Sequence, residues 1–238
     1  AVAGATDAAK STAAIVLTKP GLSVIIDAIK ESRMIFQRMS HYVTYRIAET
    51  IRVLFFITLS ILIFGFFPIT ALMIVLLALL NDIPIMTIAW DNVLYSRSPE
   101  RWKMREILTL ATLIGFVGVV SSFTMLAIVQ GPLHLSLDVI RSLIFLKLAV
   151  AGHLTVFVAR TRGPFWSVRP APALLGAVII TQSVATLITV YGFIITPIGW
   201  PLAVFVWVYA LVWALVITDP IKVYIYRLID RGSIPFVR

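Results

Sequence analysis

Hydrophobic residues form six long apolar runs along the chain, separated by short polar connectors. A helix needs about 20 apolar residues to cross a hydrocarbon core about 30 Å thick, and each run comes close to that length. Hydropathy places the predicted spans at 45–66, 69–90, 106–129, 139–160, 172–195 and 200–218. The pattern therefore predicts an all-α polytopic membrane protein with six transmembrane helices.

The residues before the first span fall into two parts. Residues 1–21 are small and weakly polar, and within them 13–17 is a short strand candidate that ends at a Lys-Pro-Gly turn. From 22 to 44, apolar positions recur at helical spacing between basic residues, which predicts a cytoplasmic amphipathic helix that runs straight into the first span. The expected divisions are 1–21, 22–44, a membrane domain over 45–218 and a cytoplasmic tail over 219–238.

The first span carries charged residues that lipid normally excludes. Only 15 uncharged residues lie between Val53 and Phe67, about 22 Å of helix, which is too short to cross the hydrocarbon. The helix must therefore begin near Arg46, and Glu49 and Arg52 then lie inside the membrane or at its inner edge. Their spacing of three places all three charges on one side of the helix. For Arg46 or Glu49 alone, a structural ion pair or snorkelling to the interface is an open alternative.

The second span contains Asn81 and Asp82, followed by Pro84. Pro84 removes a backbone donor and frees the carbonyl of Leu80, so we expect a broken or kinked helix beside Asp82 and a polar pocket there. If the first two spans are antiparallel, Asp82 and Arg52 lie at similar depths. An intramembrane acid with an arginine at matching depth is a functional-site hypothesis.

Lys147 and His153 are the other ionisable residues well inside a span. The favoured interpretation is packing or snorkelling of Lys147 and a hydrogen-bonded His153, and the alternative is an auxiliary role in transport. The histidines are scattered along the chain, so no metal site is expected.

The composition and the basic residues support the membrane assignment. The chain has 238 residues, of which 60% are hydrophobic and 13% charged, a formal net charge of +9 and no cysteine. Lysines and arginines gather in 91–105, 160–170 and the tail, while the alternate connectors have none. By the positive-inside rule both termini are cytoplasmic, and the positive charge does not indicate nucleic-acid binding.

Several motifs together resemble a known family. They are Thr6-Asp7-Ala8-Ala9-Lys10-Ser11, Ile15-Val16-Leu17-Thr18-Lys19-Pro20-Gly21-Leu22-Ser23, Arg33-Met34-Ile35-Phe36-Gln37-Arg38-Met39, Asn81-Asp82, Asp91-Asn92, Ser96, Pro99, Trp102, Arg160-Thr161-Arg162 and Ala185-Thr186-Leu187-Ile188. In this order they resemble P-type ATPases of the plasma-membrane proton-pump class, from the end of the phosphorylation domain to the last span.

The resemblance implies an organisation and a set of site residues. The six spans would be transmembrane helices 5–10, with 1–21 the end of the phosphorylation domain and 22–44 a stalk helix. Asp82 matches the carboxylate that accepts and releases the proton, Arg52 the plant-type membrane arginine, and Arg46 the fungal-type one. Glu49 and Pro84 are unlike the relatives.

The resemblance also implies what other parts of a pump would supply. The family's phosphorylation, dephosphorylation and nucleotide-binding motifs do not occur in this sequence, so no catalytic residue is assigned to it. ATP and Mg²⁺ are expected in the phosphorylation, nucleotide-binding and actuator domains, which with transmembrane helices 1–4 would be its partners. The expected location is the plasma membrane, in contact with the lipid bilayer.

The resulting hypothesis is the membrane portion of a proton-exporting pump, with Asp82 as proton carrier, Arg52 and Arg46 as modulating charges, and Glu49 and Asn81 beside them. One alternative is a P-type pump for another monovalent cation, with Glu49, Asp82 and freed backbone carbonyls as ligands. A second is a truncated, non-catalytic membrane protein or subunit. Whether the chain is an enzyme on its own stays open.

Overall fold

The computed structural model describes residues 1–18, 23–94, 102–131 and 135–231. The predicted turn at 19–21, the motif residues Ser96 and Pro99, and the end of the tail lie outside the described residues. The described elements are all helical: α1 (Asp7–Thr12), α2 (Ser23–Phe64), α3 (Ala71–Thr87), η1 (Ile88–Trp90), α4 (Met104–Gln130), α5 (Leu137–Ala159), α6 (Pro172–Tyr191), α7 (Gly199–Val212), η2 (Trp213–Thr218) and α8 (Asp219–Asp230).

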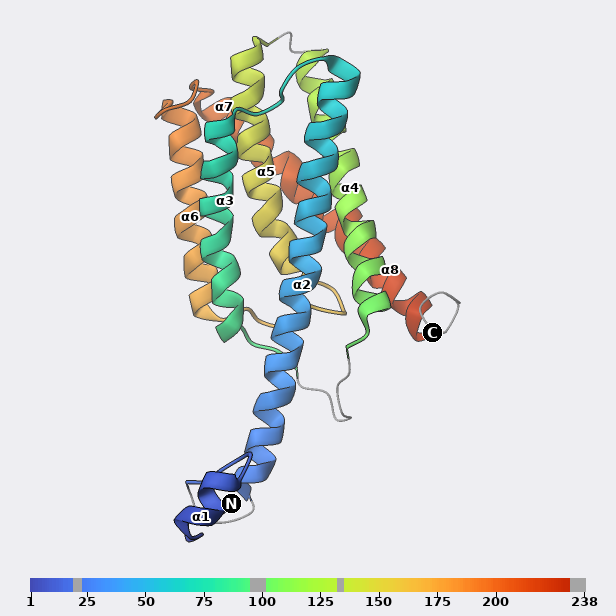
Figure 1. Cartoon of the computed structure of the whole chain (residues 1–238). Coiled ribbons are helices and arrows are strands. Elements are labelled where there is room, and N and C mark those ends of the chain that lie inside the picture. Colours follow the sequence, from blue (N-terminus) through green and yellow to red (C-terminus); the bar gives the residue numbers. More distant parts are fainter. Residues whose placement is uncertain (19–22, 95–101, 132–134, 232–238) are drawn as a thin grey trace.

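Helix α2 is the longest element and extends well beyond the bundle, toward the short helix α1 (Figure 1). Its 42 residues contain neither proline nor glycine, so nothing interrupts its backbone hydrogen bonds. It ends where Gly65 takes a positive φ of 69°, a conformation that glycine adopts without steric cost. The predicted continuity between the amphipathic helix and the first span is confirmed.

Helix α5 is the centre of the bundle. Within its most apolar window 83% of the residues are buried, against 28–44% in the other candidate spans. It contacts α2, α3, α4, α6 and α7. Its core side chains, such as Leu143, Phe145 and Leu148, are fully buried in one large apolar cluster. Polar side chains on α5 are therefore held at the middle of the molecule.

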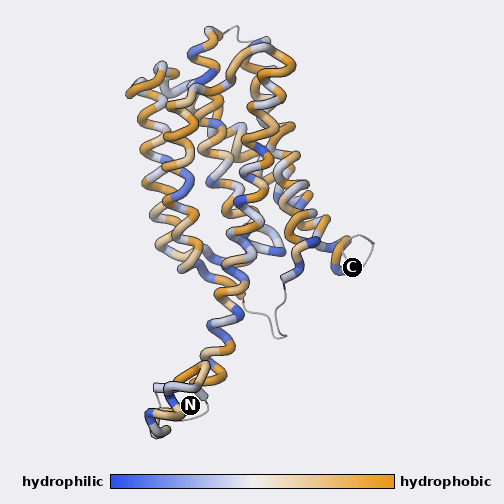
Figure 2. The backbone as a smooth tube through the Cα atoms, in the orientation of Figure 1, coloured by the Kyte–Doolittle hydropathy of each residue, from blue (hydrophilic) through white to orange (hydrophobic). Residues whose placement is uncertain are grey.

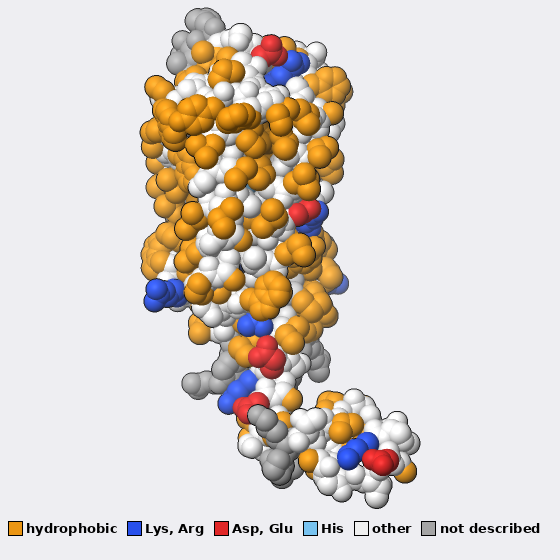
Figure 3. All heavy atoms as spheres, turned by 90° about the vertical axis from the view of Figure 1, so that its left-hand side faces the viewer, with side chains coloured by type: hydrophobic (Ala, Val, Ile, Leu, Met, Phe, Trp, Pro, Cys, Tyr) orange, Lys and Arg blue, Asp and Glu red, His pale blue; other side chains and the backbone are white. Residues whose placement is uncertain are grey.

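The outside of the bundle is apolar. Six helices are long and apolar enough to cross a membrane, which confirms the six predicted spans. The helices of the bundle are mostly hydrophobic along their length (Figure 2). Hydrophobic side chains also cover most of the face in Figure 3, where only a few charged groups interrupt them. Exposed leucines and isoleucines such as Leu62 and Ile63, 75% and 64% exposed, suit contact with lipid.

Three segments differ from the sequence prediction. Residues 13–17 form no strand; they are extended, and the Leu17 N–H donates to the Ala1 carbonyl at 2.8 Å, too little pairing for a ladder. Helix α6 ends at Tyr191, before the predicted 195, because Gly192 caps it with a left-handed φ of 80°. The last helix continues through η2 and α8 to Asp230, so part of the predicted tail is helical.

Candidate functional site

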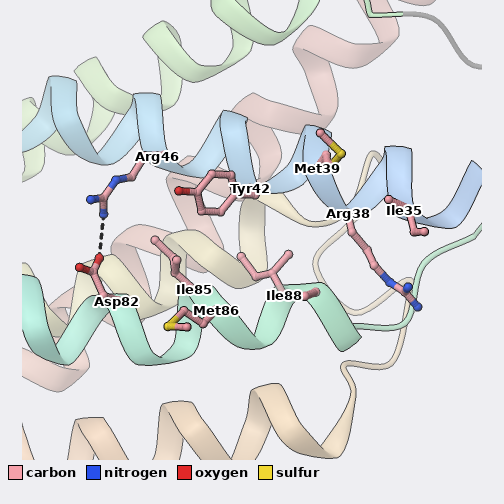
Figure 4. A pocket seen from close by; sticks show the side chains of 10 residues that line it. Ile35, Arg38, Met39, Tyr42, Arg46, Asp82, Ile85, Met86 and Ile88 are labelled. Carbon is pink, nitrogen blue, oxygen red and sulfur yellow. Dashed lines mark hydrogen bonds and ion pairs between the residues drawn. The ribbon is translucent and has the colours of Figure 1, made fainter. Parts of the chain in front are cut away.

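The outermost part of the site is an ion pair between α2 and α3. Arg46 Nη1 lies 2.9 Å from Asp82 Oδ1, and the two side chains point toward each other across the gap between the helices (Figure 4). Each side chain is 48% exposed. An acid from the second span is thus directly paired with an arginine from the first.

A second, buried cluster lies on the inner side of α2. Arg52 forms an ion pair with Glu49, and their side chains are only 3% and 9% exposed. Asn81 Nδ2 donates to Glu49 Oε1 at 3.2 Å, and Arg52 Nη1 donates to Thr155 Oγ1 of α5 at 3.1 Å. The cluster therefore joins α2, α3 and α5 at the centre of the bundle.

The partner of Asp82 differs from the sequence prediction, which placed Arg52 beside it. Six residues of an α-helix turn through about 600°, so Arg46 and Arg52 point about 120° apart. Arg46 consequently faces Asp82, while Arg52 faces the interior. The prediction that all three charges share one side was wrong, because steps of three residues drift around the helix.

Two glycines make room for the Arg52 side chain. A Cβ at Gly118 of α4 would lie 2.7 Å from Arg52 Cδ, and one at Gly152 of α5 would lie 3.3 Å from Arg52 Nη2 and 3.0 Å from Asn81 Nδ2. Contacts this short are closer than packed atoms tolerate. Gly118 and Gly152 therefore form a slot that holds Arg52.

The predicted helix break at Pro84 is absent. Helix α3 continues through Pro84 to Thr87 and passes into η1 only at Ile88. A proline inside a helix is tolerated in a membrane when neighbouring groups satisfy the freed backbone. His153 of α5 lies close to the backbone of Leu80, whose carbonyl is the one that Pro84 leaves without its helical donor.

His153 is fully integrated into the core. Its Nδ1 lies 2.7 Å from the Ala149 carbonyl and its Nε2 lies 2.9 Å from Thr181 Oγ1. The ring is only 3% exposed. These contacts agree with the predicted hydrogen-bonded histidine.

Lys147 does not snorkel. It is fully buried, and its Nζ donates to Ser122 Oγ of α4 at 2.5 Å. A cation far from the helix ends, bonded only to a hydroxyl in the described contacts, needs further compensation.

The pocket beside Asp82 is less polar than predicted. Arg38, Arg46 and Asp82 line it together with seven apolar or aromatic residues: Ile35, Met39, Tyr42, Ile85, Met86, Ile88 and Ala89. The uninterrupted α3 explains the difference, because its backbone carbonyls stay within the helix instead of lining the pocket.

The sequence analysis did not find a buried ion pair at one end of the bundle. Arg160 Nε and Nη2 bind Asp91 Oδ2 and Oδ1 at 2.6 and 3.0 Å, and both side chains are 1% exposed. Asp91 Oδ1 also accepts from the Ala171 N–H at 2.9 Å. The sequence places Arg160 in a basic connector and, like Asp91, among the family motifs, but hydropathy gives no signal for their pairing.

Lys222, counted as a tail charge, is also buried. Its Nζ donates to Asp219 Oδ1 at 2.6 Å and to the Val158 carbonyl at 2.9 Å. The i, i+3 spacing of Asp219 and Lys222 on a helix was the available signal. Both buried pairs fix the end of α5 to its neighbours.

The described residues include no group of three His, Asp or Glu side chains that could hold a metal ion. The fold and the charges within it define a polytopic helical membrane protein with ionisable groups at membrane depth.

Three comparisons with known proteins extend this description. The chain is 55% identical over 95% of its length to a Methanocaldococcus jannaschii protein whose name describes a cation-transporting ATPase. It is 37% identical over 90% of its length to a probable plasma membrane ATPase of Dictyostelium discoideum. It is also 37% identical over 81% of its length to plasma membrane ATPase 2 of Saccharomyces cerevisiae. No protein-family model matches the chain.

The chain belongs to the P-type ATPases and matches the C-terminal membrane portion of such proteins. It spans 28%, 23% and 20% of the lengths of these three relatives. The resemblance inferred from the motifs is confirmed.

Proposed function

We propose that this chain is the membrane portion of an ATP-driven pump that exports protons, with Asp82 as the group that carries the proton. The observation that carries the proposal is the 2.9 Å contact between Asp82 and Arg46, which joins two membrane helices at a depth where unpaired charges are costly. The names of the relatives, plasma membrane ATPase and cation-transporting ATPase, support ion transport by the whole protein.

Arg46 is the group that would change the proton affinity of Asp82. A cation beside a carboxyl favours its ionised form, and separating the two favours the protonated form. Because the groups lie on different helices, a movement of α2 relative to α3 would alternate between these conditions. The ion pair would also oppose return of a released proton.

Helix α2 is the element suited to drive that movement. It is continuous from Ser23 to Phe64 and reaches from beyond the bundle to Arg46 and Glu49 inside it. The proposal places both termini on the cytoplasmic side, and α8 ends at the same end of the bundle as the start of α2 (Figure 1). ATP and Mg²⁺ would be bound by the other pump domains, outside this chain.

The buried cluster of Arg52, Glu49 and Asn81 would keep α2 in contact with α3 and α5 while α2 moves. Arg52 forms an ion pair with the Glu49 carboxylate, and the Asn81 side-chain amide donates a hydrogen bond to the same carboxylate. In this proposal Arg52 acts on Asp82 only through the position of α2, since its own partner is Glu49.

A pump for another monovalent cation is a second candidate. Asn81 Oδ1 is buried without a hydrogen-bond partner, next to the Glu49 carboxylate that its own amide contacts. Two oxygens of this kind could serve a cation that displaces the Arg52 guanidinium. Hard cations bind to oxygen ligands, and the oxygens available here belong to Glu49 and Asn81. This candidate therefore predicts that Glu49, not Asp82, determines transport.

Acidification of proteoliposomes tests the proposal. The full-length pump that contains this chain is reconstituted, and ATP-dependent acidification of the lumen is compared between the wild type and Asp82→Asn. We expect Asp82→Asn to abolish acidification, because an amide cannot take up and release the proton at this position.

Asp138→Asn is the matched control. Asp138 is also a spanning-helix aspartate paired with an arginine, but its side chain is 70% exposed at the start of α5, so the control should acidify normally. Wild-type acidification by Asp82→Asn would exclude Asp82 as carrier. ATP hydrolysis with movement of another cation, abolished by Glu49→Gln, would instead support the second candidate.

A further inference from the structure

A small internal cavity lies beside Arg52, and neither Arg46 nor Asp82 lines it. Helices α2, α4, α5 and α7 with η2 form its walls. The lining residues are Arg52, Ile114, Gly118, Ser121, Lys147, Ala151, Thr155, Val158, Ala210, Trp213, Ala214 and Thr218. Its polar lining consists of two basic side chains, an indole and three hydroxyls, and includes no carboxylate.

Two donors in this lining have no hydrogen-bond partner. They are Nε of Arg52 and Nε1 of Trp213, both buried. Arg52 is 97% buried, with 3% of its surface exposed. Arginine and tryptophan side chains can only donate, so the missing partner must be a hydrogen-bond acceptor.

Lys147 also indicates that a hydrogen-bond acceptor is missing from the cavity. Its only contact to an acceptor side chain in the described structure is Ser122 Oγ, although an ammonium group has three donors. Trp213 lies in η2, where the helix has a wider turn, and such turns often occur at functional sites.

With Lys147 protonated, the charges of the cluster do not balance. Glu49 compensates Arg52, whereas the buried Lys147 has no carboxylate partner among the described residues. One monovalent anion beside Arg52 and Lys147 would make the four charges neutral and satisfy the two free donors. Burial of an uncompensated charge is strongly unfavourable.

We propose that this cavity is a binding site for one small monovalent anion of the halide class, for which chloride is the probe. Arg52 Nε, Trp213 Nε1 and Lys147 Nζ are its donors. The site does not depend on which cation the pump moves, and it holds Lys147 and Arg52 in place.

Thermal unfolding of the purified full-length pump tests the site without a transport assay. The midpoint is measured during titration with potassium chloride against potassium gluconate at constant ionic strength. A ligand that binds only the folded state raises the midpoint in a saturable manner. We expect such a rise with chloride and none with gluconate, which is too large for the cavity.

Three variants locate the effect. Lys147→Met removes the charge and Trp213→Phe removes one donor, and each should raise the apparent dissociation constant for chloride, by about tenfold or more for Lys147→Met because hydrogen bonds to charged groups are the strong ones. Trp207→Phe is the matched control, since Trp207 Nε1 already donates to Thr186 and does not line the cavity. Its chloride response should equal that of the wild type.

Two results would overturn the site. One is a midpoint that chloride does not change, as expected if Lys147 is uncharged and water fills the cavity. The other is a chloride effect that neither Lys147→Met nor Trp213→Phe weakens. If Lys147→Met does not fold, Trp213→Phe decides the question.

Discussion

The arginines Arg46 and Arg52 come from one helix but meet different surroundings. Arg46 is half-exposed and binds Asp82 directly, whereas Arg52 is buried against Glu49 and two glycines. An exposed pair contributes little to stability and can exchange partners, whereas breaking a buried pair is costly. The mobile charge at the site is therefore Arg46, and Arg52 is the fixed one.

Replacing Gly118 by alanine tests the slot around Arg52. The new Cβ would lie 2.7 Å from Arg52 Cδ, and overpacking of this kind typically costs about 1–3 kcal/mol. Gly176→Ala is the control, because this glycine is also helical and partly buried but has nothing within 4 Å of its Cβ position. The replacement of glycine by alanine favours the helix by the same amount at both positions. We expect a lower unfolding midpoint for Gly118→Ala only; equal midpoints would refute the slot.

Removing one or both charges of the buried Arg52–Glu49 pair separates the cost of burying an unpaired charge from the attraction between the two charges. Glu49→Gln leaves the Arg52 guanidinium buried without a counter-charge, which should cost about 3–5 kcal/mol of unfolding free energy. Glu49→Gln combined with Arg52→Gln should recover much of this loss. Unfolding midpoints of the wild type, both single variants and the double variant check the order, and additive losses in the double variant would show that the pair is not coupled.

At the scale of elements, α3 stays helical through Pro84, and we expect the nearby His153 of α5 to serve the Leu80 carbonyl that Pro84 leaves without its helical donor. His153→Ala should be destabilising in the wild type, where the Leu80 carbonyl loses its donor. In a Pro84→Ala background the restored N–H of residue 84 can serve that carbonyl, so His153→Ala should cost less. The double-mutant cycle measured by thermal unfolding should give a coupling of about 0.5–3 kcal/mol. A coupling of zero would mean that His153 does not compensate for Pro84.

The junction between the end of α3 and the end of α5 depends on one buried ion pair. Asp91→Asn would leave Arg160 buried without its carboxylate, and we expect a loss of about 3–5 kcal/mol. The Asp138–Arg141 pair is exposed, with Asp138 70% accessible, so Asp138→Asn should change stability by about 1 kcal/mol or less. Comparable midpoints for the two variants would contradict the assigned role of Asp91.

The helices and several site residues could be predicted from sequence, for a physical reason. Lipid demands long apolar helices, so hydropathy located all six spans. Helix length alone placed Glu49 and Arg52 inside the membrane. Which charge faces which depends on angles around each helix, so the Arg46–Asp82 pairing was missed. The sequence did not show that α3 continues through Pro84 without a break, because the neighbours that surround this part of α3, such as His153, come from a distant part of the chain.

At the scale of the whole molecule, the described bundle corresponds to one part of its longer relatives. The chain covers only 20–28% of the three relatives reported above. The Arg46–Asp82 pair is half-exposed on the surface of this part, so it is accessible to whatever else surrounds it. The inner cluster is enclosed by α2, α3, α4 and α5.

The number of protons moved per ATP hydrolysed tests the central claim most directly. Lumen pH and phosphate release are recorded together in sealed proteoliposomes that contain the full-length pump, either wild type or Asp82→Asn. The account predicts a fixed, non-zero ratio for the wild type and a ratio of zero for Asp82→Asn at any residual rate of hydrolysis. An unchanged ratio in Asp82→Asn, even at a reduced rate, would contradict the assignment of Asp82 as the proton carrier.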